Sequence, residues 1–159
     1  MPSMSEFTHS NGCYGLTVVA VYTGTDRVLE GEPFALKPAS GCFAVDRPKA
    51  ATDLFAGVAA KTYPADTGSR QIELYIPGSR GVKVRIGETV ADGNTGVCGY
   101  NASTGGKKFK KDSTAKAITA YGPGVCVFRE AVTYSAGDPK THIARADLPA
   151  SAYVAPVSV

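Results

Sequence analysis

The sequence predicts an all-β protein: a compact antiparallel β-barrel or sandwich with extended N- and C-terminal arms and at most one short helix. Of its 159 residues, 18 are glycine and 10 are proline, with no collagen-like period, and such frequent interruptions argue against long helices. Short β-rich runs bounded by Gly, Pro, Asn or Asp recur along the chain, as in barrels and sandwiches. Hydrophobic residues at 43% and charged residues at 19% exclude a wholly disordered chain, and the length suits one domain.

Residues 71–86 show the clearest alternation of apolar and polar side chains. The apolar members are Ile72, Leu74, Ile76, Val82, Val84 and Ile86. A period of two places alternate side chains on one face of a strand, so we predict that these six point into the core of an antiparallel strand pair. The segment 77–81, Pro-Gly-Ser-Arg-Gly, separates the two strands as a turn or a strand crossover.

The other predicted strands are shorter and less regular. They are residues 16–22, 28–36, 42–45, 54–60, 96–100, 117–121 and 125–134. The single helical candidate is 48–55, where Arg47-Pro48 can open a turn, but this stretch is short and runs into Gly57.

The two ends of the chain differ from the middle. The predicted organisation is an N-terminal arm 1–12, a β-rich core 13–147 and a C-terminal arm 148–159. The first arm is polar, whereas the second is apolar, proline-bearing and uncharged. Burying Tyr153, Val154 or Val157 is worth about 1.5 kcal/mol or more for each side chain, so we expect the C-terminal arm to dock on its own core or on a neighbouring subunit.

Charge and hydropathy limit the partners. The 17 basic and 14 acidic residues give a net charge of +3, which is too small for a strong overall attraction to nucleic acid or anionic lipid. No apolar run approaches the roughly 20 residues that cross a bilayer, and the first residues resemble no cleaved export signal. We expect a soluble, unexported protein with no membrane partner.

Four cysteines lie far apart in the sequence, at Cys13, Cys42, Cys98 and Cys126. No pair has the C-x-x-C spacing of a zinc site or a redox couple, although their number allows two disulfides. In an unexported protein we predict that they are reduced thiols that pack as small apolar residues.

Catalytic and metal-binding signatures are missing. The only histidines are His9, in the polar arm, and His142, which we expect in a solvated loop. Neither belongs to a nucleophile motif, and Asp92-Gly93-Asn94 is a turn rather than a calcium loop. The run Gly105 to Lys108 lacks the first glycine and the final Ser or Thr of a phosphate loop. We expect no enzyme activity, no metal and no cofactor.

One basic cluster stands out, formed by Lys107, Lys108, Lys110 and Lys111 around Phe109. Lysines around an aromatic ring can grip a phosphate backbone and stack a base, which would make this a nucleic-acid-binding β-barrel. Lysines on an exposed strand also protect a sheet edge from unwanted pairing. We favour the second interpretation, and with it no nucleic-acid partner.

The order of the remaining motifs resembles that of bacteriophage head-decoration, or capsid cement, proteins. The resemblance covers about residues 28–132. It comprises Leu54-Phe55-Ala56-Gly57-Val58-Ala59, Ile72 to Gly78, the strand Val82 to Gly87, Asp92 to Val97, Gly105 to Phe109, and Gly122 to Ala131. These match a "GVA" strand, a strand that closes in a glycine turn, an alternating strand, a G-x-x-V start of a new strand and a final glycine-rich strand.

The resemblance implies a non-enzymatic virion protein, assembled in the host cytoplasm, on the outer surface of an icosahedral shell. There it would clamp adjacent major capsid subunits, often as a trimer. Extended arms suit this role because they can add a strand to a neighbour's sheet. The expected capsid or subunit contacts are Phe7, His9, Tyr153, Val154, Pro156 and Val157. A virion surface glycan-binding module is a second alternative, which the 8 tyrosines allow and the absence of tryptophan disfavours.

Overall fold

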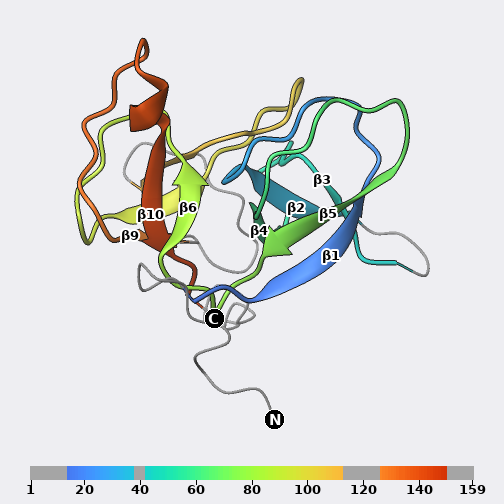
Figure 1. Cartoon of the computed structure of the whole chain (residues 1–159), viewed down its shortest axis with the longest axis horizontal. Coiled ribbons are helices and arrows are strands. Elements are labelled where there is room, and N and C mark those ends of the chain that lie inside the picture. The colour runs from blue at the N-terminus through green and yellow to red at the C-terminus, as the bar shows by residue number, and fades with distance from the viewer. Residues whose placement is uncertain (1–13, 38–41, 113–125, 150–159) are drawn as a thin grey trace.

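The computed structural model describes residues 14–37, 42–112 and 126–149, and it confirms the predicted all-β class. The first five strands form a closed barrel in the order β1-β3-β2-β4-β5 (Figure 1). Their bounds are β1 Thr17–Tyr22, β2 Pro33–Lys37, β3 Ala44–Asp46, β4 Phe55–Ala59 and β5 Arg70–Tyr75. The pair β1–β3 is parallel and the other four pairs are antiparallel. We call this part the N-terminal half.

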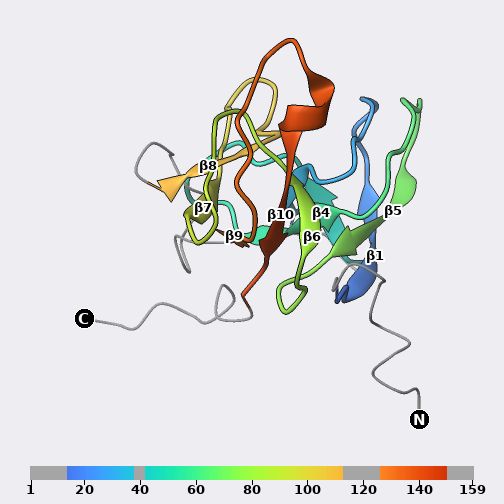
Figure 2. The same cartoon turned by 60° about the vertical axis from the view of Figure 1, so that its left-hand side comes forward.

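The next five strands form a second sheet, the C-terminal half, in the order β6-β10-β9-β7-β8. Their bounds are β6 Val82–Arg85, β7 Thr95–Cys98, β8 Phe109–Lys111, β9 Cys126–Phe128 and β10 Ile143–Asp147. A parallel bridge between Ile86 and Phe109 returns β8 to the end of β6. The second sheet therefore curls toward closure, and Figure 2 shows the two halves side by side.

The two halves repeat one strand ladder. Each half pairs its first strand with its third in parallel, and pairs first with fifth, fifth with fourth, fourth with second and second with third in antiparallel. The registers also match, because each pair of facing residues in the N-terminal half has a counterpart in the C-terminal half. Ala20–Ile72 corresponds to Val84–Ala144, and Phe34–Gly57 corresponds to Gly96–Cys126. In the same way, Leu36–Val45 corresponds to Cys98–Phe109, and Ala59–Leu74 corresponds to Phe128–Ala146. The same backbone plan thus occurs twice in tandem.

Different side chains fill the two interiors. Where β2 contributes Phe34, the equivalent position in β7 is Gly96, and a Cβ there would lie 2.8 Å from the Phe128 ring. The interior aromatic ring in this part of the core is Phe34 of β2 in the N-terminal half and Phe128 of β9 in the C-terminal half. Large and small residues have exchanged strands, so both cores are packed although their sequences differ.

The halves share apolar packing where they meet. Ala35, Phe55 and Val58 of the barrel belong to the same buried cluster as the interior of the C-terminal half. The Phe55 and Phe109 rings meet edge to face with centroids 6.0 Å apart. Burial of these side chains depends on both halves, which couples their stabilities.

The predicted alternation is confirmed at Ile72, Leu74, Val82, Val84 and Ile86, all at most 1% exposed. Ile76 is a correction: it is only partly buried, because it follows the end of β5, where its N–H donates to the Leu16 carbonyl. Of the two roles proposed for segment 77–81, the structure shows the crossover. It carries the chain from one sheet to the other, and β5 does not pair with β6.

The predicted helix at 48–55 is wrong. The Asp53 carboxylate accepts hydrogen bonds from the N–H groups of Lys49 and Ala50, which closes a turn before β4 instead. A short 3-10 helix lies at Pro139–His142, where the Asp138 side chain caps the first turn.

Strand predictions failed where apolar side chains are small or the run is irregular. The sequence analysis missed β10, whose inward residues are the alanines Ala144 and Ala146. In the predicted strand 28–36, the observed strand begins only at Pro33. In the predicted strand 125–134, the observed strand ends at Phe128. Predicted strand 117–121 lies outside the described residues.

The cysteines that the structure describes carry free thiols. Cys98 and Cys126 are fully buried in the C-terminal half, and Cys42 is exposed. Burial raises the pKa of the Cys98 thiol well above its usual value, with a further contribution from nearby Cys126, and burial also raises that of Cys126. Cys13 lies outside the described residues.

Val84→Asp should unfold the protein, because it places an unpaired carboxylate at a fully buried position in the middle of β6. Lys83→Gln, at the next and exposed position, should change the free energy of unfolding by less than about 0.5 kcal/mol. Chemical denaturation followed by circular dichroism measures both. Equal tolerance of the two changes would contradict the observed register.

Thiol labelling of the native protein should modify Cys42 quickly and leave Cys98 and Cys126 unmodified until denaturant is added. The two buried thiols are shielded and rarely ionised, and the thiolate is the reactive form. Mass spectrometry after a timed pulse of iodoacetamide measures each site. Labelling of Cys126 as fast as Cys42 under native conditions would refute the buried assignment.

Candidate interaction surfaces

The described residues next to the two arms, Tyr14 and Leu148, which we call the arm roots, are hydrogen-bonded to the crossover 77–81. This contact lies at the end of the molecule where β1 begins and β10 ends (Figure 1). Tyr14 and Arg80 exchange two backbone hydrogen bonds of 2.8 and 2.6 Å. The Leu148 carbonyl accepts from Gly78 N–H at 2.6 Å, and Leu148 N–H donates to the Ser79 carbonyl at 2.8 Å. Segments that follow the N-terminal arm and precede the C-terminal arm therefore lie side by side.

Buried side chains stabilise this set of contacts between the arm roots and the crossover, which we call the junction. Ser79 is fully buried, and its Oγ accepts from Leu16 N–H at 2.9 Å and donates to the Leu16 carbonyl at 3.2 Å. Leu148 is 1% exposed and packs in the core of the C-terminal half. The junction is thus part of the folded core, and Leu148 belongs to it.

A groove with a volume of about 300 Å³ lies at the junction. Its lining residues are Gly78, Arg80, Val127, Arg129, Asp147, Leu148 and Pro149. Asp147 accepts from Arg129 Nε at 2.6 Å and from Gly81 N–H at 2.9 Å, so it links Arg129 to the crossover. Arg80 and Arg129 are exposed at this groove. The groove thus combines apolar side chains with two arginines, one of them paired with Asp147, and such a mixed surface can accept an extended peptide segment.

The predicted arm contacts lie outside the described residues. This applies to Phe7, His9, Tyr153, Val154, Pro156 and Val157, whose roles stay predictions. His142 lies at the end of the 3-10 helix and stacks on Tyr134 with ring centroids 5.0 Å apart, so it is more constrained than the expected solvated loop residue.

The lysine cluster does not form one patch. Lys107 Nζ lies 3.4 Å from the Asp26 carboxylate, whereas Lys108 Nζ lies 6.0 Å from the centre of the Tyr134 ring. Phe109 is fully buried and has no face for a base. The strand β8 stands at the end of the sheet order, and the Glu88 carboxylate accepts from Lys111 N–H at 2.8 Å. This arrangement favours edge protection over a phosphate grip.

The strongest electrostatic centre was missed by the sequence analysis. Arg47, which follows β3, is 3% exposed and forms ion pairs with Glu32, also buried, and with Asp26 at 2.9 Å. Its guanidinium lies 4.6 Å from the centre of the Phe34 ring. Nothing in the sequence around Arg47 indicates that this side chain is buried. In the sequence, Arg47-Pro48 is interpreted only as the possible start of a helix.

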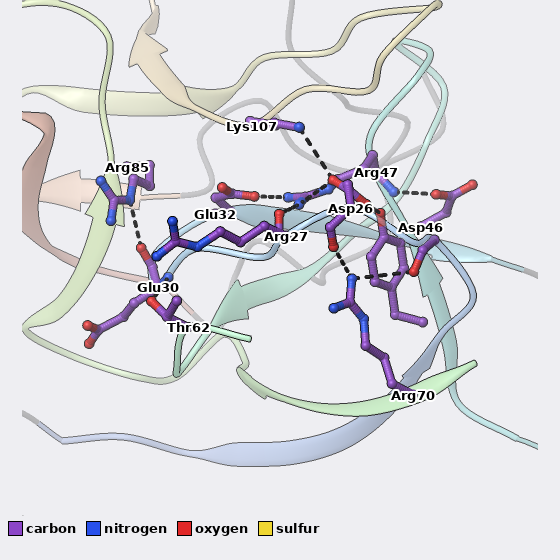
Figure 3. Close-up of polar contacts among 12 residues, drawn as sticks. Asp26, Arg27, Glu30, Glu32, Asp46, Arg47, Thr62, Arg70, Arg85 and Lys107 are labelled. Atoms are coloured by element: carbon purple, nitrogen blue, oxygen red, sulfur yellow. Dashed lines mark hydrogen bonds and ion pairs between the residues drawn. The ribbon is translucent and has the colours of Figure 1, made fainter. Parts of the chain in front are cut away.

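Asp26 connects several donors in this centre (Figure 3). It accepts from the Tyr22 hydroxyl and pairs with both Arg47 and Lys107. Burial alone would raise the pKa of Asp26, but the Tyr22 hydrogen bond, the Arg47 charge and Lys107 together lower it to about 2. Burial and the bond to Asp26 raise the pKa of Tyr22 to about 12. Despite burial, its acidic partners raise the pKa of Arg47 as well.

This centre also seats the loop that connects β7 and β8. The Pro48 carbonyl accepts from Gly106 N–H at 2.7 Å and from Asn101 N–H at 3.2 Å. Gly105 has a φ of 78° and approaches Arg47 so closely that a Cβ would lie 2.1 Å from the Arg47 Cβ. The centre therefore joins the two halves.

Comparison with known proteins gives a structural match without a sequence match. No family model matches the sequence, and no curated protein matches it. Among solved structures, the N base of head fiber gp8.5 in bacteriophage phi29 aligns with a TM-score of 0.51 and 13% identity, covering 84% of this chain and 94% of that one. The likeness is one of fold. Because it covers so much of the chain, it extends over both halves.

Metal-binding clusters and membrane-spanning helices are absent from the described parts of the chain. No group of three or more His, Cys, Asp or Glu side chains is placed there to hold a metal ion. No helix within these segments is long and apolar enough to cross a membrane.

Stability should fall as the pH drops from about 4 toward 2, in part through Asp26. Its pKa of about 2 in the folded protein lies below the ordinary value, so its carboxylate stabilises the fold above that range and loses this contribution on protonation. Asp26→Asn should flatten the dependence of unfolding free energy on pH in this window, measured by denaturant titration at each pH. The matched control is Asp92→Asn on an exposed turn, and equal slopes for both variants would contradict the assignment.

Proposed function

We propose that this protein is a non-enzymatic decoration, or cement, protein of a bacteriophage head. It binds the outer surface of the assembled shell and bridges adjacent major capsid subunits. The observation that carries the proposal is the fold likeness to a phage head fiber base over 84% of the chain. The resemblance of residues 28–132 to head-decoration proteins supports it independently of the structure.

The junction geometry supports the same function. The described residues next to the arms, Tyr14 and Leu148, are bonded to the crossover beside the groove, so arms and groove could meet one surface together. Several modest contacts made at once give a large combined affinity, because each contact raises the effective concentration of the next. A protein that repeats by symmetry over a shell multiplies this effect, and a trimer is the expected assembly.

The arms supply the attachment in this proposal. Extended backbone can add to an edge strand of a capsid subunit, and Tyr153, Val154 and Val157 can bury apolar surface in the same contact. Exposed ion pairs contribute about 0 to 1 kcal/mol each, so the lysines add little by comparison. This division of roles can be tested directly.

Removal of residues 1–12 or of residues 150–159 should reduce binding to undecorated shells while leaving thermal unfolding nearly unchanged. The second truncation begins after Pro149 because Leu148 is part of the core. The matched control is Lys108→Gln with Lys110→Gln, which changes exposed lysines and keeps the Lys107 ion pair with Asp26. Co-sedimentation with shells at low and high salt measures occupancy.

Failure of the full-length protein to bind shells would refute the decoration function. Normal binding by both truncated proteins, together with loss of binding in the lysine variant, would show that a charged edge recognises an acidic capsid surface. The nucleic-acid alternative predicts instead that DNA binds and that log affinity falls against log salt with a slope near −3.6 if about four phosphates are neutralised.

A further inference from the structure

The C-terminal half repeats a surface that the N-terminal half uses to hold strand β6. In the N-terminal half this surface is the turn 29–32. Arg85 N–H donates to the Gly31 carbonyl at 2.9 Å, and Arg85 Nε donates to the Glu30 carbonyl at 2.9 Å (Figure 3). Lys83 Nζ lies 3.9 Å from the Glu30 carboxylate. A basic strand thus crosses the turn, with lysine and arginine at positions i and i+2.

The turn 91–94 has the same backbone. Gly31 and Gly93 have φ values of 87° and 84°. Each glycine N–H donates at 2.8 Å to the equivalent residue of the fourth strand, Ala59 or Phe128. One backbone hydrogen bond closes each turn. Glu32 N–H donates to the Leu29 carbonyl in the first turn and Asn94 N–H donates to the Ala91 carbonyl in the second, both at 3.1 Å. The two turns therefore share these two backbone hydrogen bonds and the positive φ of the glycine.

Only the first turn is covered among the described residues. A Cβ at Gly31 would lie 3.0 Å from both Arg85 N and the Lys83 carbonyl, whereas a Cβ at Gly93 would meet nothing within 4 Å. Gly31 is buried, but Ala91, Asp92 and Gly93 are all exposed. Within the described segments, the second turn therefore presents the same acceptors without a covering strand.

The charge that recognises the covering strand is also repeated. Asp92 occupies the place of Glu30, the carboxylate that Lys83 approaches. A pocket of about 420 Å³ lies beside the second turn, lined by Asn94, Thr95, Lys111 and Asp112. The equivalent region of the N-terminal half, around Glu32 and Arg47, is covered by the loop between β7 and β8. The carboxylate of Asp92 and the adjoining pocket thus lie at the positions that, in the N-terminal half, contact the C-terminal half.

Two segments of a second copy are unsuited to occupy the second turn. In a second copy, β1 is the equivalent of β6, but Val21 N–H, in the place of Arg85 N–H, already donates to the Phe43 carbonyl at 2.8 Å. Val19 stands where β6 has Lys83. Residues 150–159 contain no lysine or arginine.

We propose that the turn 91–94 is a docking site for an extended segment of a partner protein that carries basic side chains at positions i and i+2. The Gly93 and Asp92 carbonyls accept hydrogen bonds from the partner's backbone and side chain, and the Asp92 carboxylate pairs with its other cation. This inference rests on the repeat within the chain and not on the shell-binding function.

The probe is a synthetic peptide with the chain's own β6 sequence, Gly-Val-Lys-Val-Arg-Ile-Gly (residues 81–87). Titration into isotope-labelled full-length protein should shift the amide resonances of residues 91–95 in a saturable way. A peptide with glutamate in place of lysine and arginine should cause no such shifts. Asp92→Lys should weaken binding at least fivefold, because it removes one exposed ion pair and adds repulsion of the basic peptide, whereas the control Asp66→Lys in the other half should not.

Absence of shifts at 91–95, or shifts only around Gly31, would overturn the proposal. Equal binding of the glutamate peptide, or equal affinity of Asp92→Lys and wild type, would also overturn it, because charge would then play no part. Amide spectra of both variants check that they are folded. Shell co-sedimentation is a separate measurement, so failure of the peptide to bind leaves the decoration function to its own test.

Discussion

The architecture depends on one buried charge. The guanidinium of Arg47 is almost fully enclosed, and a buried cation is tolerated only when it is paired and hydrogen-bonded. Glu32 and Asp26 supply the countercharge from the segment before β2, so the end of β3 has to stay beside that segment. Loss of one partner from such a pair typically costs about 3 to 5 kcal/mol, which is a large fraction of a domain's stability. The loop between β7 and β8 then docks on the ordered backbone that follows Arg47.

The tandem arrangement explains how a chain so rich in glycine and proline forms a stable core. Neither half encloses all of its apolar surface alone, since Phe55 and Val58 on the outside of the barrel belong to the interior cluster of the C-terminal half. Stacking two similar units buries these faces together, as in repeat proteins. The exchange of the interior aromatic ring between Phe34 and Phe128 shows that one backbone plan can be filled by different residues as long as the volume is conserved.

The sequence predicts the class of the fold because alternation and turn residues act locally. It identifies the strands around Ile72 and Val84, where large aliphatic side chains mark one face. It misses β10, because alanines give a weak signal until a neighbouring sheet makes small residues necessary. The repeat is also hidden, since equivalent positions such as Phe34 and Gly96 share backbone pairing but no chemistry. The Arg47 centre and the junction groove depend on contacts between distant segments, which no local pattern encodes.

The anchoring of both arms on the crossover 77–81 determines how the protein carries mechanical load. Tyr14 is bonded to Arg80, and Leu148 is bonded to Gly78 and Ser79, so the arm roots are linked through a few residues of backbone. Tension applied between two objects held by the two arms would travel through this short path and not through either set of strands. The barrel and its partner sheet would then bear little of the strain as long as these backbone bonds hold.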